Sequence, residues 1–307
     1  MSLRAAAAIA LVIGIAAAVA AWAMPHPIRV GGVGLGDIGL PMIGIRGFAQ
    51  GANPYDLRLA GSTPALYPFT AMLVLWPFAY LPLRLAAPCF LGLSSALLAW
   101  AILRRGQPWQ LLMFLSPPYW SAVYSVQWSP AMTAALLLPA LLPLAVVKPQ
   151  LGVVLAAAGR WSRATLIAAA ALVFLSLAIW PAWPIEWLHK GNLQTFNGRV
   201  PVLVLPGFVL LAGVLAWRTR EGRLLLALSL VMQRFFYDQL PLYLIPKSWR
   251  QMLILLATSW FAVLIPLRLG WLDLMTGAQD PRVWTAVILG MFLPALGIVL
   301  TSRRGLR

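Results

Sequence analysis

Long runs of apolar residues, interrupted by short breaks that contain Arg, Pro or Gly, extend along almost the whole chain of 307 residues. A helix of roughly 20 apolar residues is long enough to cross a bilayer. The runs predict membrane segments at 5–24, 85–103, 108–125, 164–181, 200–217, 224–237, 239–249, 250–268 and 282–301. The pattern therefore predicts an all-α integral membrane protein, with residues 1–307 forming a single polytopic membrane domain.

Composition supports this prediction and excludes a water-soluble globular enzyme. Hydrophobic residues make up 62% of the chain and charged residues only 10%, which is far from the usage of soluble domains. The net charge of +16 comes from basic residues that stand singly or in small groups between apolar runs. We interpret them as topology signals and contacts to membrane lipids, with no nucleic acid as partner.

The first apolar run, residues 5–24, is long enough to be the first transmembrane helix. A cleaved signal peptide is the alternative, because Arg4 precedes the run and Ala21-Trp22-Ala23 resembles a cleavage site. The polytopic character of the remaining chain favours the transmembrane helix.

The distribution of basic residues predicts the orientation of the chain. Most of them collect on one side if both chain ends are cytoplasmic. The cytoplasmic group is Arg4, Arg104, Arg105, Arg160, Arg163, Arg218, Arg220, Arg223, Lys247, Arg250, Arg303, Arg304 and Arg307. This orientation places six of the seven acidic residues on the outer side, where residues 25–65 and 182–200 form substantial loops. It also requires residues 66–83 to enter and leave on the outer face as a re-entrant segment.

Residues 129–159 are too long for one straight span and contain four prolines. Proline removes a backbone donor and kinks or ends a helix. One interpretation is a pair of half-helices around Lys148, an arrangement that often marks a substrate site. A single kinked and tilted helix is the other.

Asp37 is the first candidate for chemistry. It precedes a short helix in the first outer loop, predicted to lie in the membrane interface from the spacing of Ile38, Met42, Ile45 and Ala49. Asp37 is expected either to cap that helix by accepting backbone N–H bonds or to act as a general base.

Several polar motifs follow Asp37 in order along the chain. They are Gly51 with Asn53-Pro54-Tyr55, Tyr67-Pro68, Ser121 with Gln127, Lys148-Pro149, and Tyr237-Asp238. In this order they resemble the C-type glycosyltransferases, in particular the alpha-mannosyltransferases that depend on polyprenol-phosphomannose. The chain departs from that pattern in three places: Phe69 stands where a second Pro is usual, Val126 replaces the Gly before Gln127, and the distance from Gln127 to Lys148 is short.

The resemblance implies a bundle of about 10–12 transmembrane or re-entrant helices, like that of the C-type glycosyltransferases. It further implies an inverting transfer of a sugar, with mannose favoured, from a polyprenyl-phosphate donor to a lipid or glycan acceptor. The reaction would take place at the outer face of a bacterial cytoplasmic membrane, with Asp37 as the catalytic base. No metal or other cofactor is expected, because the sequence contains no Asp-x-Asp pair.

The substrate-binding candidates combine motif residues with basic groups that suit a leaving phosphate. They are Asn53, Tyr55, Tyr67, Gln127, Lys148, His189, Arg234, Tyr237 and Asp238. Each has a simpler explanation. Asn53-Pro54 favours a turn, the Lys148 side chain can snorkel, and Arg234 lies about one turn before Asp238. His189 lies in a predicted surface loop, and His26, between two prolines, is expected to have no role.

Two other functions remain open at this point. A transporter or flippase for a lipid-linked sugar would also contain broken helices and a buried lysine, although the sequence shows no internal repeat. A non-catalytic membrane subunit predicts that Asp37, Lys148 and Asp238 do not converge in space.

Overall fold

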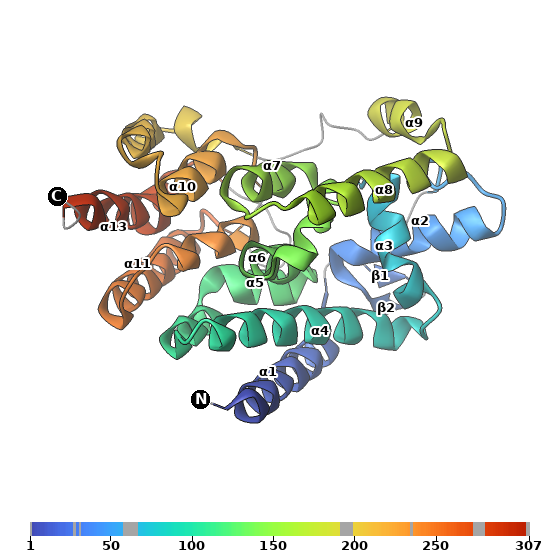
Figure 1. Ribbon diagram of the computed structural model, residues 1–307, viewed down its shortest axis with the longest axis horizontal. Coiled ribbons are helices and arrows are strands. Elements are labelled where there is room, and N and C mark those ends of the chain that lie inside the picture. Colours follow the sequence, from blue (N-terminus) through green and yellow to red (C-terminus); the bar gives the residue numbers. More distant parts are fainter. Residues whose placement is uncertain are drawn as a thin grey trace. The chain divides into compact units, whose positions relative to one another are not determined.

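A computed structural model describes residues 2–26, 29–30, 32–57, 67–190, 199–233, 236–272 and 280–304 (Figure 1). Most of these residues are helical, and the strands among them are the two-residue β1 (Arg29–Val30) and β2 (Val33–Gly34), which pair antiparallel. The all-α prediction is confirmed. Among the described residues, four helices are apolar and long enough to cross a membrane: α1 (Leu3–Ala23), α4 (Leu83–Arg104), α11 (Trp249–Arg268) and the continuous run Arg282–Ser302.

Apolar side chains are exposed at high density on α1 and on other helices of the structure. On α1, Leu11 and Val12 are 61% and 65% exposed, and an apolar window of this helix has a mean hydropathy of 2.4. Phe174 on α8 (Arg163–Ile179) is 70% exposed. Lipid tails satisfy such surfaces, so the helices indicate a multi-pass membrane protein.

The chain forms two compact units. Unit 1 comprises Met1–Arg104, Ala122–Gly152 and Gly159–Phe196, and unit 2 comprises Arg105–Ser121, Val153–Ala158 and Asn197–Arg307.

In unit 1, α1 and α4 pack closely in opposite directions (Figure 1). A Cβ atom added to Gly14 would lie 2.8 Å from the backbone oxygen of Gly92, and one added to Gly92 would lie 3.0 Å from Ala18 Cβ. Small residues allow helices to approach this closely in a membrane. Because the helices run antiparallel, the intervening chain leaves and returns at one end of the pair, as the predicted re-entrant segment requires.

The described part of the intervening chain contains three short helices, η1 (Gly36–Ile38, a 3₁₀ turn), α2 (Gly39–Ala49) and α3 (Phe69–Ala79). An 11-residue helix such as α3 is about 16 Å long, roughly half the thickness of a bilayer core. Arg46 of α2 ties the two helices together, because its Nε donates to the carbonyl of Ala79 at 2.6 Å and its Nη2 to that of Leu81 at 2.7 Å. These bonds satisfy carbonyls at the end of α3.

Residues 129–159 form three pieces: α6 (Ser129–Leu137), the 3₁₀ helix η3 (Pro139–Val146) and α7 (Pro149–Ala158). The prediction of half-helices around Lys148 is confirmed, and the single kinked helix is wrong. The breaks coincide with prolines that begin η3 and α7, where the missing N–H costs no helical bond.

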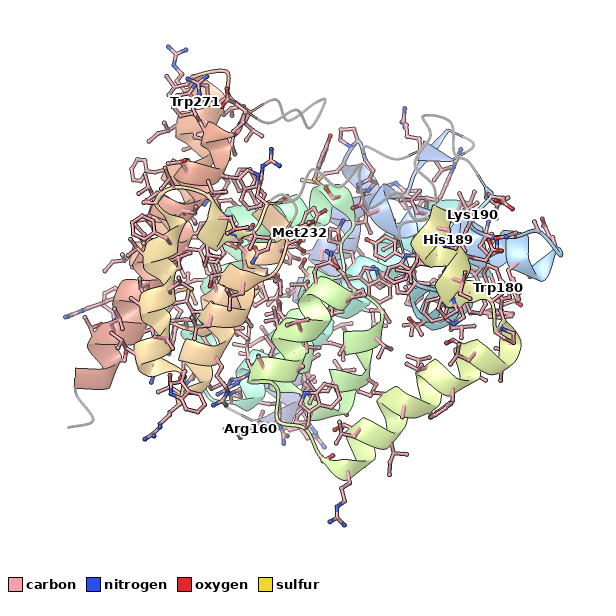
Figure 2. The ribbon with its side chains drawn as sticks, turned by 90° about the horizontal axis from the view of Figure 1, so that it is seen from above. Arg160, Trp180, His189, Lys190, Met232 and Trp271 are labelled. Atoms are coloured by element: carbon pink, nitrogen blue, oxygen red, sulfur yellow. The ribbon has the colours of Figure 1, made fainter. Side chains whose placement is uncertain are left out.

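The predicted span 164–181 corresponds to α8, which turns by 87° into α9 (Trp183–Lys190). The indole Nε1 of Trp183 donates to Ser176 Oγ at 3.1 Å across this bend. Figure 2 shows Arg160 near the start of α8, with Trp180 at the far end and His189 and Lys190 beyond it on α9. The predicted second outer loop therefore begins with a helix.

Unit 2 is built from shorter pieces than the sequence predicts. Its described helices are η2 (Pro108–Leu115), the first residues of α5 (Pro117–Ser125), the last residues of α7, η5 (Pro201–Leu203), η6 (Gly207–Ala216), α10 (Arg220–Leu230), η7 (Phe236–Leu244), α11, α12 (Arg282–Val287), the π turn η8 (Ile288–Phe292) and α13 (Leu293–Arg304).

Four predicted single spans that fall wholly or partly in unit 2 are wrong. The predicted span 108–125 is divided between η2 and α5, and the span 200–217 is divided between η5 and η6. The span 224–237 continues beyond the end of α10, and the span 239–249 falls mostly in the 3₁₀ helix η7. Prolines stand at or inside most of these breaks, and a proline ends an α-helix that hydropathy alone would continue.

Candidate functional site

The site begins where two backbone segments of unit 1 meet. Gly36, with φ of 57°, packs so closely on the loop after α5 that an added Cβ would lie 2.4 Å from the carbonyl oxygen of Ser125. Val126 in that loop has φ of 45°, a left-handed conformation that is costly for a β-branched residue. Backbone strain of this kind persists where the surroundings hold it and clusters at functional sites.

This contact brings together three polar side chains, which we call the Asp37 cluster: Asp37, Gln127 and Lys148. The amide Nε2 of Gln127 donates to Asp37 Oδ2, and Lys148 Nζ donates to Gln127 Oε1 at 3.1 Å. Gln127 is fully buried, Lys148 is 4% exposed and Asp37 is half-buried. One amide thus links a carboxylate to an ammonium group.

Asp37 does not cap a helix. It is the middle residue of η1, and the cap positions of η1 and α2 are Leu35 and Ile38, neither of which makes a side-chain cap bond. The helix-capping interpretation is therefore wrong. Its carboxylate is held by a side chain that lies 90 residues later in the chain.

Lys148 lies directly before α7, and its carbonyl accepts the first helical bond from Gly152 N at 2.8 Å. Lys148 is therefore the residue at which α7 begins, where the helix dipole is positive. Next to Gln127, two more buried polar atoms, Trp128 Nε1 and Ser129 Oγ, have no hydrogen-bond partner among the described residues. Buried groups of this kind are costly unless something satisfies them.

A second polar group, which we call the loop cluster, joins the turn at residues 53–56 to α9 through Asn53, Asp56, Glu186 and Lys190. Lys190 Nζ lies 2.7 Å from Asp56 Oδ1 and 2.7 Å from Glu186 Oε2, and Asn53 Nδ2 donates to Glu186 Oε2 at 3.3 Å. Asn53 Oδ1 also accepts from the backbone N of Tyr55 at 3.0 Å, so the turn predicted at Asn53-Pro54 is confirmed.

The electrostatics of the loop cluster are those of an exposed ion-pair network. The hydrogen bond from Lys190 lowers the pKa of Glu186, and the bond to Asp56 raises the pKa of Lys190. Tyr55, beside this cluster, is 3% exposed and stacks on Trp180 with ring centroids 5.2 Å apart. Burial raises the pKa of the Tyr55 hydroxyl, so the phenol stays neutral and its ring serves packing.

The other predicted site residues belong to other elements of the structure. Tyr67 is buried just before α3, and His189 is exposed on α9. Tyr237 and Asp238 are buried in η7 of unit 2. Arg234 lies outside the described residues.

The expectation that His26 has no role is wrong. Its ring is buried, with Nδ1 2.7 Å from the carbonyl oxygen of Tyr124 and Nε2 2.6 Å from that of Ala21. His26 therefore ties the end of α1 to the segment that precedes Gln127. Its position between two prolines, directly after an apolar helix, was the signal in the sequence.

Among the described residues, no group of three or more His, Cys, Asp or Glu side chains could hold a metal ion. No protein-family model, curated protein or solved structure matches the chain. The resemblance to glycosyltransferases therefore stays a prediction that rests on the motif residues.

Proposed function

We propose that the protein is an inverting glycosyltransferase that moves a sugar, with mannose favoured, from a polyprenyl-phosphate donor to a lipid or glycan acceptor. The observation that carries the proposal is the Asp37 cluster, in which a carboxylate and a buried ammonium group are held through one glutamine. The order of the surrounding motifs supports the same reaction.

Asp37 would act as the general base. Its carboxylate takes the proton of an acceptor hydroxyl, the hydroxyl oxygen forms a bond to the anomeric carbon, and the bond from that carbon to the phosphate oxygen breaks. The electron pair leaves with the polyprenyl phosphate, and the single displacement inverts the anomeric centre. Proton transfer by a positioned base typically contributes about 10²–10⁴ in rate.

Lys148 would stabilise the departing phosphate. Lys148 directly precedes α7, and cations and helix N-termini both favour phosphate. An ionisable side chain inside an apolar bundle is costly to bury, and such residues usually serve function. Burial also strengthens the attraction, because water screens it less.

Gln127 would be a positioning residue for both groups. Its amide donates through nitrogen to Asp37 and accepts through oxygen from Lys148. A side-chain amide offers both roles at once, whereas a carboxylate at this position would repel Asp37. The orientation of Asp37 is thereby coupled to Lys148.

The proposal is tested by supplying the purified protein with polyprenyl-phosphate mannose radiolabelled in the sugar, together with an extract of membrane lipids as acceptor. Wild-type protein should convert the donor into free polyprenyl phosphate and a labelled product, and Asp37→Asn should abolish this while eluting as a folded species in size-exclusion chromatography. Full transfer by Asp37→Asn would refute the assignment of the base. A wild-type protein that moves the donor across vesicles without forming product would be a flippase.

A further inference from the structure

A cavity of about 560 Å³ lies in unit 1, where α1 ends and α4 begins. Its walls come from Ala21–His26, which include the last residues of α1, from the β1–β2 ribbon, and from Arg84 and Pro88 of α4. In Figure 1 the ribbon lies close to the first turns of α4. The lining includes no member of the Asp37 cluster, so this cavity is distinct from the proposed transfer site.

The cavity is lined by positive charge. Arg29 of β1 and Arg84 of α4 both contribute to its wall, and among the described residues no carboxylate does. Within the described part of the chain, neither arginine forms an ion pair with a carboxylate. Two guanidinium groups of this kind suit an oxygen-rich anion, because each presents several donors in a fixed plane.

His26 completes the wall without offering a free nitrogen to a ligand. Both of its ring nitrogens lie within 2.7 Å of backbone carbonyl oxygens. Because carbonyl oxygens face both nitrogens, neither nitrogen is free to contact a ligand. Gly34 gives the ring room, since an added Cβ there would lie 3.0 Å from His26 Cβ.

The helix dipoles do not supply the charge of this cavity. The positive end of α4 and the negative end of α1 meet here because the two helices run antiparallel, and their partial charges oppose each other. The side chains of Arg29 and Arg84 therefore determine what the cavity attracts.

The surrounding aromatic residues place the cavity at the edge of the membrane. Trp22, which lines it, is 58% exposed, and Tyr80, which precedes α4, is 74% exposed. Exposed Trp and Tyr at the end of an apolar helix are typical of the headgroup level of a bilayer. The phosphates of membrane lipids lie at this level.

We propose that this cavity binds the phosphate of an anionic membrane lipid through Arg29 and Arg84. The site is additional to the donor phosphate at Lys148, and its existence does not depend on the transferase activity. A phosphate between the two guanidinium groups would connect the β1–β2 ribbon to α4, directly before the segment that carries Asp37.

The test is lipid binding by the full chain, measured by native mass spectrometry in detergent with phosphatidylglycerol or phosphatidylcholine added. Phosphatidylglycerol should bind wild-type protein, and Arg29→Gln with Arg84→Gln should weaken that binding by roughly tenfold for each arginine. The matched control is Arg160→Gln with Arg163→Gln, which removes the same charge from two exposed arginines near the start of α8. It should bind like wild type.

Inorganic phosphate added as competitor distinguishes the two sources of the ligand. Competition shows that the phosphate group alone is recognised, and its absence shows that the lipid chains are also required; both results support the site. Equal binding by wild type and the Arg29/Arg84 variant, or equal binding of phosphatidylcholine, overturns it. Asp37→Asn should bind phosphatidylglycerol normally, which separates this proposal from the transferase assignment.

Discussion

The Asp37 cluster and the loop cluster both contain a lysine bonded to acidic or amide side chains, yet they differ in burial. Lys148 is 4% exposed, whereas the side chains of Lys190 and Asp56 are 36% and 60% exposed. Exposed ion pairs contribute little because water screens them and the side chains lose entropy. Buried ones are costly to assemble and costly to disrupt.

This difference divides the sequence motifs into two kinds. Asn53 and Asp56 belong to a turn whose side chains bond to Glu186 and Lys190 of α9, so a structural role accounts for them. Asp37, Gln127 and Lys148 come from three separate segments and meet in an apolar unit, where packing alone would favour hydrophobic residues. Chemistry therefore explains the second group better than stability does.

A large effect is expected at only one of the two lysines when they are replaced in parallel. Lys148→Met should lower donor turnover by about 10²–10³, the typical loss for one group that stabilises a developing negative charge. Lys190→Met removes the same charge from an exposed network and should leave turnover close to wild type. The comparison is measured as release of polyprenyl phosphate under saturating donor. Equal losses in both variants would contradict the distinction between the clusters.

Two glycines with positive φ test the backbone contact beneath Asp37. Gly51 has φ of 83°, and a Cβ added there would have no atom within 4 Å. Gly51→Ala should therefore lower the free energy of unfolding by about 1–2 kcal/mol for the left-handed conformation alone. The Cβ added in Gly36→Ala would lie 2.4 Å from Ser125 O. This variant should lose about 1–3 kcal/mol more of its unfolding free energy, because the contact is overpacked. Denaturant unfolding in detergent measures both.

The result for Gly36→Ala also has a functional part. The variant should lose transfer activity even where it remains folded, because the added methyl separates Asp37 from the loop that carries Gln127. If Gly36→Ala were as stable and active as Gly51→Ala, the close approach at Ser125 would not position the site.

The smallest effect is the pH dependence of the loop cluster. The lowered pKa of Glu186 stabilises the fold above the unfolded value of about 4.3, and this contribution disappears as pH falls through the folded pKa. The raised pKa of Lys190 stabilises the fold below about 10.4, and that contribution disappears as pH rises through the folded pKa.

Thermal unfolding of wild type and Glu186→Gln should therefore differ by a small, constant amount between roughly pH 6 and 9. The difference should shrink on acidification below roughly pH 4. A difference that grows in acid would show that Glu186 is paired in another way.

Much of unit 1 was predictable from the sequence, because long uninterrupted apolar runs leave only one regular structure in a membrane. This holds for α1 and α4, and for α11 and residues 282–302 in unit 2. The 3₁₀ helices η6 and η7 were not predictable in this way, since hydropathy records how apolar a segment is and not where its prolines interrupt the hydrogen bonding.

The site was predictable only as separate residues. Nothing in the spacing of Asp37, Gln127 and Lys148 brings them together, because their proximity depends on a glycine at position 36 and on the left-handed turn at Val126. The structural role of His26 and the cavity beside it also depend on tertiary contacts, so the sequence did not predict them. Sequence separation carries no information about such contacts.

The most direct test of the central claim compares the same change at two carboxylates, Asp37→Asn and Asp56→Asn, in the polyprenyl-phosphate mannose assay. If the Asp37 cluster is the catalytic site, Asp37→Asn should lose at least about 10² of the transfer rate, as expected for a general base, while Asp56→Asn should retain nearly all of it. Transfer that survives in Asp37→Asn, or falls equally in Asp56→Asn, would contradict the account.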